Sequence, residues 1–118
     1  MVKQVLIVNM DTPMSVGRLA AQACHASIQV FLNIGKWSEN NFCINNVSDS
    51  MQYWMKESFT KVVCKVWGKE KLKELYEQAV SLKLPASIIE DDGYVTAVAI
   101  GPDDSKNINP LTRDLILL

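Results

Sequence analysis

The chain has 118 residues, with 12 Lys and Arg against 13 Asp and Glu, and 48% of its residues are hydrophobic. This length predicts one domain over residues 1–118, and the composition is typical of a globular protein rather than a disordered one. The net charge of −1 excludes a broad basic field for nucleic acid, so any nucleic-acid contact must be a local patch.

The sequence indicates neither secretion nor membrane insertion. Its apolar runs are far shorter than the ~20 residues that a membrane span needs, and its first residues lack the small-residue cleavage site of a signal peptide. Three cysteines without a CxxC spacing, Cys24, Cys43 and Cys64, favour reduced, buried thiols over disulfides or a structural zinc site. We therefore expect a cytoplasmic protein without a metal site.

The first third of the chain predicts a buried strand followed by a long helix. The continuous apolar run over residues 5–8 is typical of a strand that is covered on both faces. We expect Asp11 or Thr12 to cap the helix, with Pro13 at its first position. Apolar residues at spacings of three and four extend the helix over residues 14–33.

The next third predicts a loop, a short helix and a strand. Residues 35–48 are polar and rich in Asn, and so long a loop is often functional. Asp49 with Gln52 forms a capping-box pattern that opens a short helix. Residues 59–67 are rich in β-branched side chains and predict a strand.

The last third completes the predicted sheet. Residues 69–82 form an amphipathic helix pattern, and residues 86–90 and 96–100 predict two strands joined by a turn. One helical turn is expected at Asn109-Pro110, and the apolar tail over residues 115–118 is expected to pack on the sheet. Strands that alternate with helices predict an α/β layered sheet, mostly parallel, with a hairpin near its C-terminal end.

The long helix carries a polar row that predicts a site. Arg18, Gln22, His25 and Gln29 fall at i, i+4, i+7 and i+11, and so lie along one face. Such a row lines either solvent or a cleft. Surface rows usually carry Lys and Glu, and this row has neither, which favours the cleft.

His25 is the only histidine, and histidine is the side-chain type that changes charge near neutral pH. It is a candidate general base if a reacting water lies within reach. The leading alternative is a buried histidine bonded to a backbone carbonyl. A Cys–His dyad with Cys24 is disfavoured, because adjacent helical residues do not face each other.

The segment Asp91-Asp92-Gly93 lies at a strand end, where ligands gather in α/β sheets. The evidence for a purely structural role is strong, because Asp and Gly are ordinary turn residues. No Gly-rich phosphate loop is present. Asp91 and Asp92 are thus candidates for an acid/base or metal site only if further ligands lie nearby, and the spacing assigns none.

These segments together resemble the type 2 peptidyl-tRNA hydrolase family. Its first motif, D-L-x-M-x-x-G-K-x-A-A-Q-x-x-H-A, is similar to residues 11–26, with Arg18 in place of the usual Lys. Its later block, D-A-G followed by a loop and T-V-x-A-I-G-P, is similar to residues 91–93 and 96–102. Its final I-D-x-V-T-G-x-L-K-L-L is similar to residues 109–115. The resemblance covers nearly the whole chain in order.

The resemblance implies a three-layer α/β/α domain around a mixed four-stranded sheet. The implied activity is hydrolysis of the ester that joins a peptide to tRNA, which recycles tRNA in translation without a cofactor. Carried onto this sequence, the family's site becomes Arg18, Gln22 and Asp91, joined by His25 from the same motif. Peptidyl-tRNA is then the substrate. Candidate phosphate contacts are Lys36, Lys56, Lys61, Lys65 and Arg113.

One departure from the family keeps two alternatives open. Only Tyr94 and Val95 separate Gly93 from Thr96, where the family has a longer loop that bears an active-site Thr. The family's Thr thus lacks a counterpart, and the shorter turn is expected to open one wall of the cleft. A catalytically inactive tRNA- or protein-binding module is the first alternative. A homo-oligomeric interaction domain, with a homodimer as one possible form, is the second, based on the apolar tail and on Trp37, Trp54 and Trp67.

Overall fold

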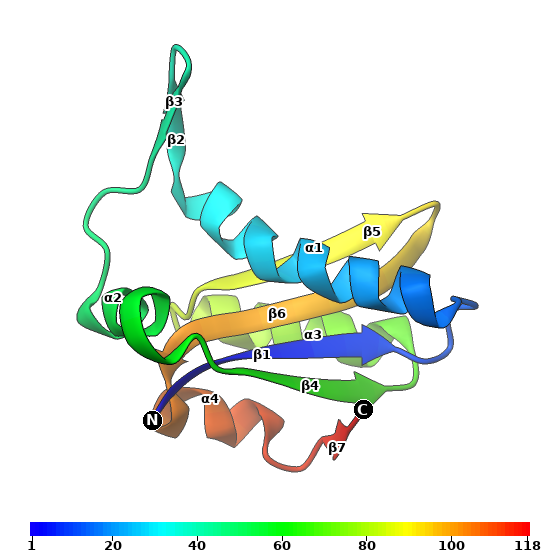
Figure 1. Cartoon of the computed structure of the whole chain (residues 1–118). Coiled ribbons are helices and arrows are strands. Elements are labelled where there is room, and N and C mark those ends of the chain that lie inside the picture. The colour runs from blue at the N-terminus through cyan, green and yellow to red at the C-terminus, as the bar shows by residue number, and fades with distance from the viewer.

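The computed structural model describes residues 1–118 and has three layers, with one sheet between helices (Figure 1). The sheet has the strand order β5-β6-β1-β4-β7. Its strands are β1 (Val2–Asn9), β4 (Lys61–Val66), β5 (Ala86–Asp91), β6 (Tyr94–Asp104) and β7 (Ile116–Leu117). The helices are α1 (Val16–Ile34), α2 (Asp49–Tyr53), the π-helical turn η1 (Trp54–Ser58), α3 (Lys69–Ser81) and α4 (Ser105–Thr112). The predicted α/β/α class is confirmed.

Strand direction and strand number differ from the predictions. Only β1 and β4 pair in parallel, whereas β6 runs antiparallel to β1 and β5, and β7 runs antiparallel to β4. The expected mostly parallel sheet is therefore wrong, because the hairpin β5–β6 places its long second strand antiparallel beside β1, the central strand. The sheet has five strands rather than four because the apolar tail pairs with β4 as β7.

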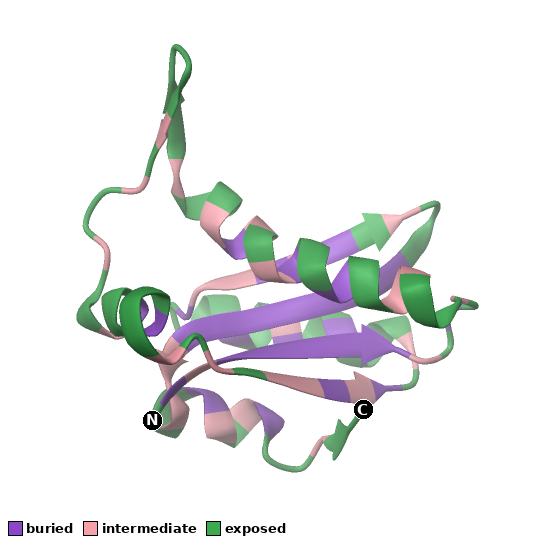
Figure 2. Cartoon of the chain, viewed as in Figure 1, coloured by how far each residue is buried: buried purple, intermediate pink, exposed green.

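Each face of the sheet has its own apolar core. Leu6 and Val8 of β1 pack toward α1 in one core, and Val5 and Ile7 belong to the core on the opposite face. Figure 2 shows β1 and most of β6 as buried along their length. The continuous apolar run of β1 thus covers both faces, as predicted. Alanines on α1, such as Ala26, allow a close approach of the helix to the sheet.

Buried polar groups fix α1 on the sheet. Gln4 in β1 is fully buried, and its Nε2 donates to the carbonyls of Ser27 and Gly101, each at 3.2 Å. The Ser87 hydroxyl of β5 donates to the Ala26 carbonyl at 2.6 Å. Because a buried polar group without a partner costs free energy, these contacts set how α1 lies along β5.

The two helix starts shift relative to the predictions. Helix α1 begins at Val16 with Ser15 as its N-cap, whose hydroxyl accepts from the Arg18 N–H at 3.1 Å. The expected start near Asp11 is wrong because Asn9 Oδ1 accepts from the Asp11 N–H, which holds that stretch in a turn. Helix α2 is capped by Ser48 rather than by Asp49.

Two further segments contain more secondary structure than predicted. Half of the expected loop forms a hairpin of β2 (Lys36–Ser38) and β3 (Asn41–Cys43), which projects from the body (Figure 1). The rings of Trp37 and Phe42 meet edge to face across it, with centroids 5.2 Å apart. The expected single turn at Asn109 is the eight-residue helix α4.

The cysteines are not all buried, contrary to the expectation. Cys24 and Cys43 are exposed, and only Cys64 is buried. Burial raises the pKa of the Cys64 thiol, and the nearby Lys3 charge partly offsets the effect. No helix combines the length and apolar character that crossing a membrane would require.

Candidate active site

Four side chains meet where β5 ends beside the first turns of α1. Arg18 Nη2 lies 3.0 Å from Asp91 Oδ2, and Gln22 Nε2 donates to the same oxygen at 3.1 Å. The Thr96 hydroxyl donates to Gln22 Oε1. The structure thus brings together three of the four predicted residues and adds Thr96.

Local sequence explains how this cluster forms. Arg18 and Gln22 are one helical turn apart, so they share a face of α1. Ser87 and Ile89 face α1, and Asp91 follows them on the same face at the strand's two-residue period. The turn after Asp91 has positive φ at both central residues, 54° at Asp92 and 81° at Gly93, which is the backbone of a two-residue hairpin.

Thr96 reaches the cluster because of an irregularity in β6. The pairing register of β5 and β6 shifts between Ile89 and Glu90, which leaves Thr96 as an extra residue in β6. Such a bulge re-aims a side chain. Val95 packs in the core on the α3 side, whereas Thr96 and Ala97 both face α1. Strict alternation would turn Thr96 away from Gln22, so sequence analysis missed it as a site residue.

The inner half of the cluster is buried and the outer half is open. Gln22 is 8% exposed and Thr96 is 0% exposed, whereas the side chains of Arg18 and Asp91 are 39% and 46% exposed. Both donors converge on Oδ2 and leave Oδ1 of Asp91 available to a water. An ion pair this exposed adds little to stability, but its two donors hold the Asp91 carboxylate in one orientation at the surface.

His25 does not join this cluster. It is exposed, which corrects the alternative of a buried, carbonyl-bonded histidine. With Gln29 and Glu90 it lines a separate surface cavity of about 330 Å³ beside β5. The structure holds no group of three or more His, Cys, Asp and Glu side chains suited to a metal ion.

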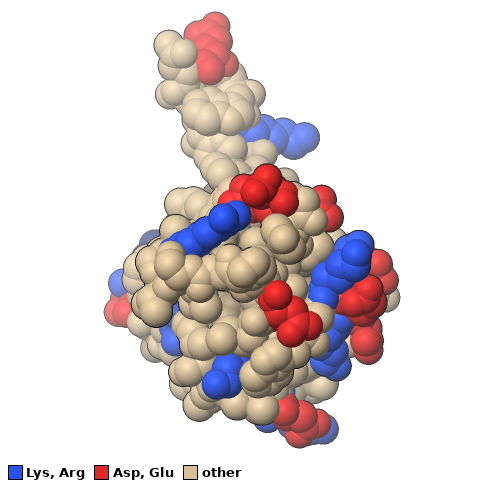
Figure 3. Space-filling model, turned by 90° about the vertical axis from the view of Figure 1, so that its right-hand side faces the viewer, with Lys and Arg blue, Asp and Glu red and all other residues tan.

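The basic residues proposed as phosphate contacts are not gathered on one element. Lys61 lies over the rings of Phe59 and Trp54, at 3.6 and 5.0 Å from their centroids, and Lys65 lies 5.8 Å from the Trp67 ring. Lys36 is on the projecting hairpin, Lys56 on η1, and Arg113 directly after α4. Figure 3 shows basic and acidic side chains interspersed on one face of the molecule rather than a continuous basic field.

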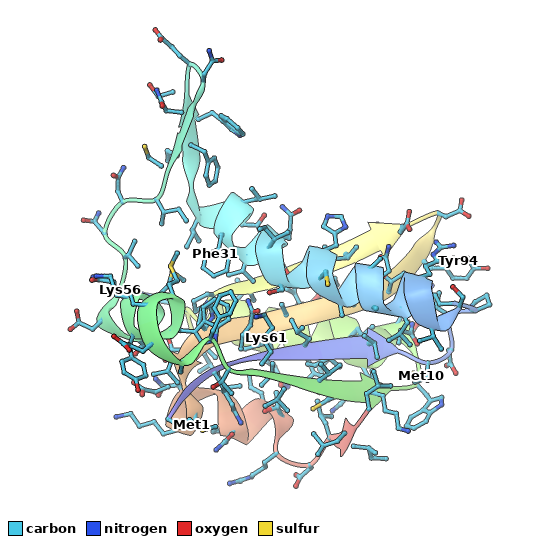
Figure 4. All side chains as sticks on the ribbon, viewed as in Figure 1. Met1, Met10, Phe31, Lys56, Lys61 and Tyr94 are labelled. Atoms are coloured by element: carbon cyan, nitrogen blue, oxygen red, sulfur yellow. The ribbon has the colours of Figure 1, made fainter.

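A second hollow lies on the other side of α1, between that helix and β4. It has a volume of about 850 Å³, and nearly all of its lining is apolar. Phe31 of α1 and Lys61 of β4, both labelled in Figure 4, line it, and Trp54 and Met55 of η1 contribute to its wall. This groove was not predicted from the sequence, and the apolar residues within the polar stretch 35–48, such as Phe42, are the signal that could have indicated it.

Comparison with known proteins identifies the family of the chain. The family model described as "Peptidyl-tRNA hydrolase PTH2" matches residues 2–118. Curated relatives named peptidyl-tRNA hydrolase include one from Methanococcus maripaludis, 38% identical over 125 aligned positions that cover all of both chains. One from Methanopyrus kandleri is 36% identical and covers 100% of this chain and 99% of the relative. One from Sulfurisphaera tokodaii is 32% identical over 98% of each chain. The chain therefore belongs to the PTH2 family of peptidyl-tRNA hydrolases.

Proposed function

We propose that this protein hydrolyses the ester bond of peptidyl-tRNA and releases free tRNA and the peptide. Family membership over the whole chain supports this activity. The convergence of Arg18 and Gln22 on one oxygen of Asp91 is the observation that supports the site. It places a fixed, solvent-accessible carboxylate beside permanent positive charge.

The proposed reaction uses water as the nucleophile. Asp91 Oδ1 accepts a hydrogen bond from the water and orients it toward the ester carbonyl carbon, taking its proton as the bond forms. The carbonyl oxygen becomes an oxyanion, which the guanidinium of Arg18 stabilises through N–H groups not used by Asp91. The carbon–oxygen bond to the ribose then breaks, and the proton passes to the leaving 3′ oxygen.

Gln22 and Thr96 act as positioning residues in this scheme. The Thr96 hydroxyl donates to Gln22 Oε1, so the amide must present its NH₂ group to Asp91. Without that contact, the amide could turn and face the carboxylate with its oxygen. The cluster forms without the family's longer loop, which favours catalysis over the alternative of an inactive binding module.

The decisive experiment compares two carboxylates of the same turn. We expect Asp91→Asn to abolish release of tRNA from N-acetyl-aminoacyl-tRNA, because an amide cannot take the proton from water. Asp92→Asn is the matched control, since Asn tolerates the positive φ of 54° found there, and it should retain activity. Tight tRNA binding without any release by the unchanged protein would instead identify a binding module.

Two further expectations stay predictions. A homodimer is supported by exposed apolar side chains, including Trp37 at 69% and Leu117 at 65% exposure. Sedimentation should then report a mass near twice 13.2 kDa, and a monomer at all concentrations would contradict it.

A cytoplasmic location follows from the proposed substrate, and cell fractionation tests it.

A further inference from the structure

Strand β5 presents a free edge of the sheet beside the proposed active site. Its only partner is β6. The Gly101 N–H donates to the Pro85 carbonyl at 2.8 Å, and residues of an antiparallel pair alternate between facing the partner and facing away. Ser87 and Ile89 therefore direct their backbone groups to β6, whereas Ala86 and Ile88 direct theirs outward.

One side chain marks the outward direction directly. Asn33 Nδ2 of α1 donates to the Ala86 carbonyl at 3.3 Å, from the side opposite β6. By the same alternation, the N–H and carbonyl of Ile88 and of Glu90 also point away from the sheet. No side chain donates to or accepts from these groups, so they are open to a ligand.

A polar groove follows this edge. The cavity of about 330 Å³ has Ile88, Ile89 and Glu90 at its floor. Its walls are His25, Gln29 and Asn33 of α1 on one side and Tyr76 of α3 on the other. The three α1 residues are spaced by four and form one row along the helix. The groove is therefore a channel whose floor is the unpaired backbone of β5.

The groove leads to the proposed catalytic carboxylate. Asp91 follows Glu90 at the end of β5, and Arg18 and Gln22, which contact it, belong to the same helix face as His25 and Gln29. From Ala86 to Asp91 the strand spans about 17 Å, at about 3.3 Å per residue. The channel can thus hold an extended segment of several residues that ends at Asp91.

We propose that the peptide part of the substrate binds here as an added strand on β5, an inference that rests on the proposed function. The ester lies at the C-terminal end of the peptide, so the preceding residues run from Asp91 back toward Ala86. The peptide is then parallel to β5. Strand addition uses main-chain hydrogen bonds, and this suits an enzyme whose substrates differ in their side chains.

The first test varies the substrate and leaves the protein unchanged. We expect kcat/KM for N-acetyl-tetraalanyl-tRNA to exceed that for N-acetyl-alanyl-tRNA by about tenfold, given about two- to tenfold for each added hydrogen bond. N-methylation of successive amides in the tetrapeptide should lower the rate only at alternate positions, because alternate amides of a strand face its neighbour. Equal rates for both substrates, or uniform sensitivity to methylation, would overturn the proposal.

The second test varies the edge. Ile88→Pro removes an outward N–H without removing a bond to β6, a placement that edge strands tolerate. For each variant we compare kcat/KM for N-acetyl-tetraalanyl-tRNA with kcat/KM for N-acetyl-alanyl-tRNA. In Ile88→Pro the ratio of these two values should fall toward one. In Ile88→Ala, which keeps the N–H, the ratio should stay as in the unchanged protein. A thermal melt of each variant checks folding.

Two outcomes separate this proposal from its rivals. If Ile28→Glu, in the apolar groove on the other side of α1, lowers the ratio while Ile88→Pro does not, the peptide occupies that groove and the β5 proposal is wrong. If the unchanged protein hydrolyses neither substrate, the proposed function itself fails. Hydrolysis of both at one rate contradicts only the strand addition.

Discussion

Arg18 stands where the family motif usually has lysine, and the two side chains differ in chemistry. A guanidinium is permanently charged and presents several N–H donors in one plane. One of these donors binds Asp91 Oδ2 at 3.0 Å, and the others remain for an oxyanion or a phosphate. A single residue can therefore hold the carboxylate and stabilise charge in the substrate at the same time.

We predict that Arg18→Ala lowers kcat/KM for peptidyl-tRNA by about 100-fold, the usual cost of losing a donor to an oxyanion. Arg18→Lys should keep most of the activity, because an ammonium also carries charge to Asp91. Release of free tRNA from N-acetyl-aminoacyl-tRNA measures both variants. An unchanged rate in Arg18→Ala would remove this side chain from the mechanism.

Thr96→Val keeps the shape of the side chain and removes the hydroxyl that fixes Gln22. We predict a fall of about tenfold in kcat with little change in KM, as expected for a lost buried hydrogen bond that positions a catalytic group. Thr96→Ser keeps the hydroxyl and should restore kcat. If both variants behave alike, the hydroxyl does not position Gln22.

At the scale of elements, local patterns predicted what local forces determine. The long helix, the amphipathic helix and the β5–β6 turn follow from periodicity and turn residues. Strand pairing does not follow from local patterns, because β1 pairs with β4 and β6, which are far from it in the sequence. The tail was too short to indicate β7, and polar residues masked the β2–β3 hairpin. The polar row of the long helix predicted Arg18 and Gln22, and the family resemblance joined Asp91 to them. Thr96, in contrast, depends on a bulge that no local pattern indicates.

Asn9 joins three elements at the end of β1. Its Oδ1 accepts from the N–H groups of Asp11 and Gly68, and its Nδ2 donates to the Val95 carbonyl at 2.9 Å. We predict that Asn9→Ala lowers the free energy of unfolding by about 1–3 kcal/mol, because it leaves the buried Val95 carbonyl without its donor. Gln78→Ala, which removes an exposed amide on α3, should change it by less than about 0.5 kcal/mol. Urea denaturation measures both, and equal effects would contradict the role of Asn9.

At the scale of the whole molecule, the reactivity of the three thiols measures which of them the fold buries, since Cys24 and Cys43 are exposed and Cys64 is buried. We predict that Cys24 and Cys43 react quickly with Ellman's reagent and that Cys64 reacts only after unfolding. Burial raises the pKa of the Cys64 thiol, so the native state holds this proton more tightly. The resulting stabilisation is complete below the ordinary thiol pKa and is lost as the pH rises through the raised value. Fast reaction of all three thiols would show that the β4 region opens readily.

The central place of β1 in the sheet governs the order in which the chain can fold. Its parallel partner begins at Lys61, and its antiparallel partner ends at Asp104. During synthesis, the apolar β1 leaves the ribosome long before either neighbour exists. Non-local pairing of this kind slows folding and prolongs the exposure of apolar, aggregation-prone segments such as β1. The sheet can therefore begin to assemble only after half of the chain has emerged, and a nascent chain arrested before β6 cannot reach the native state.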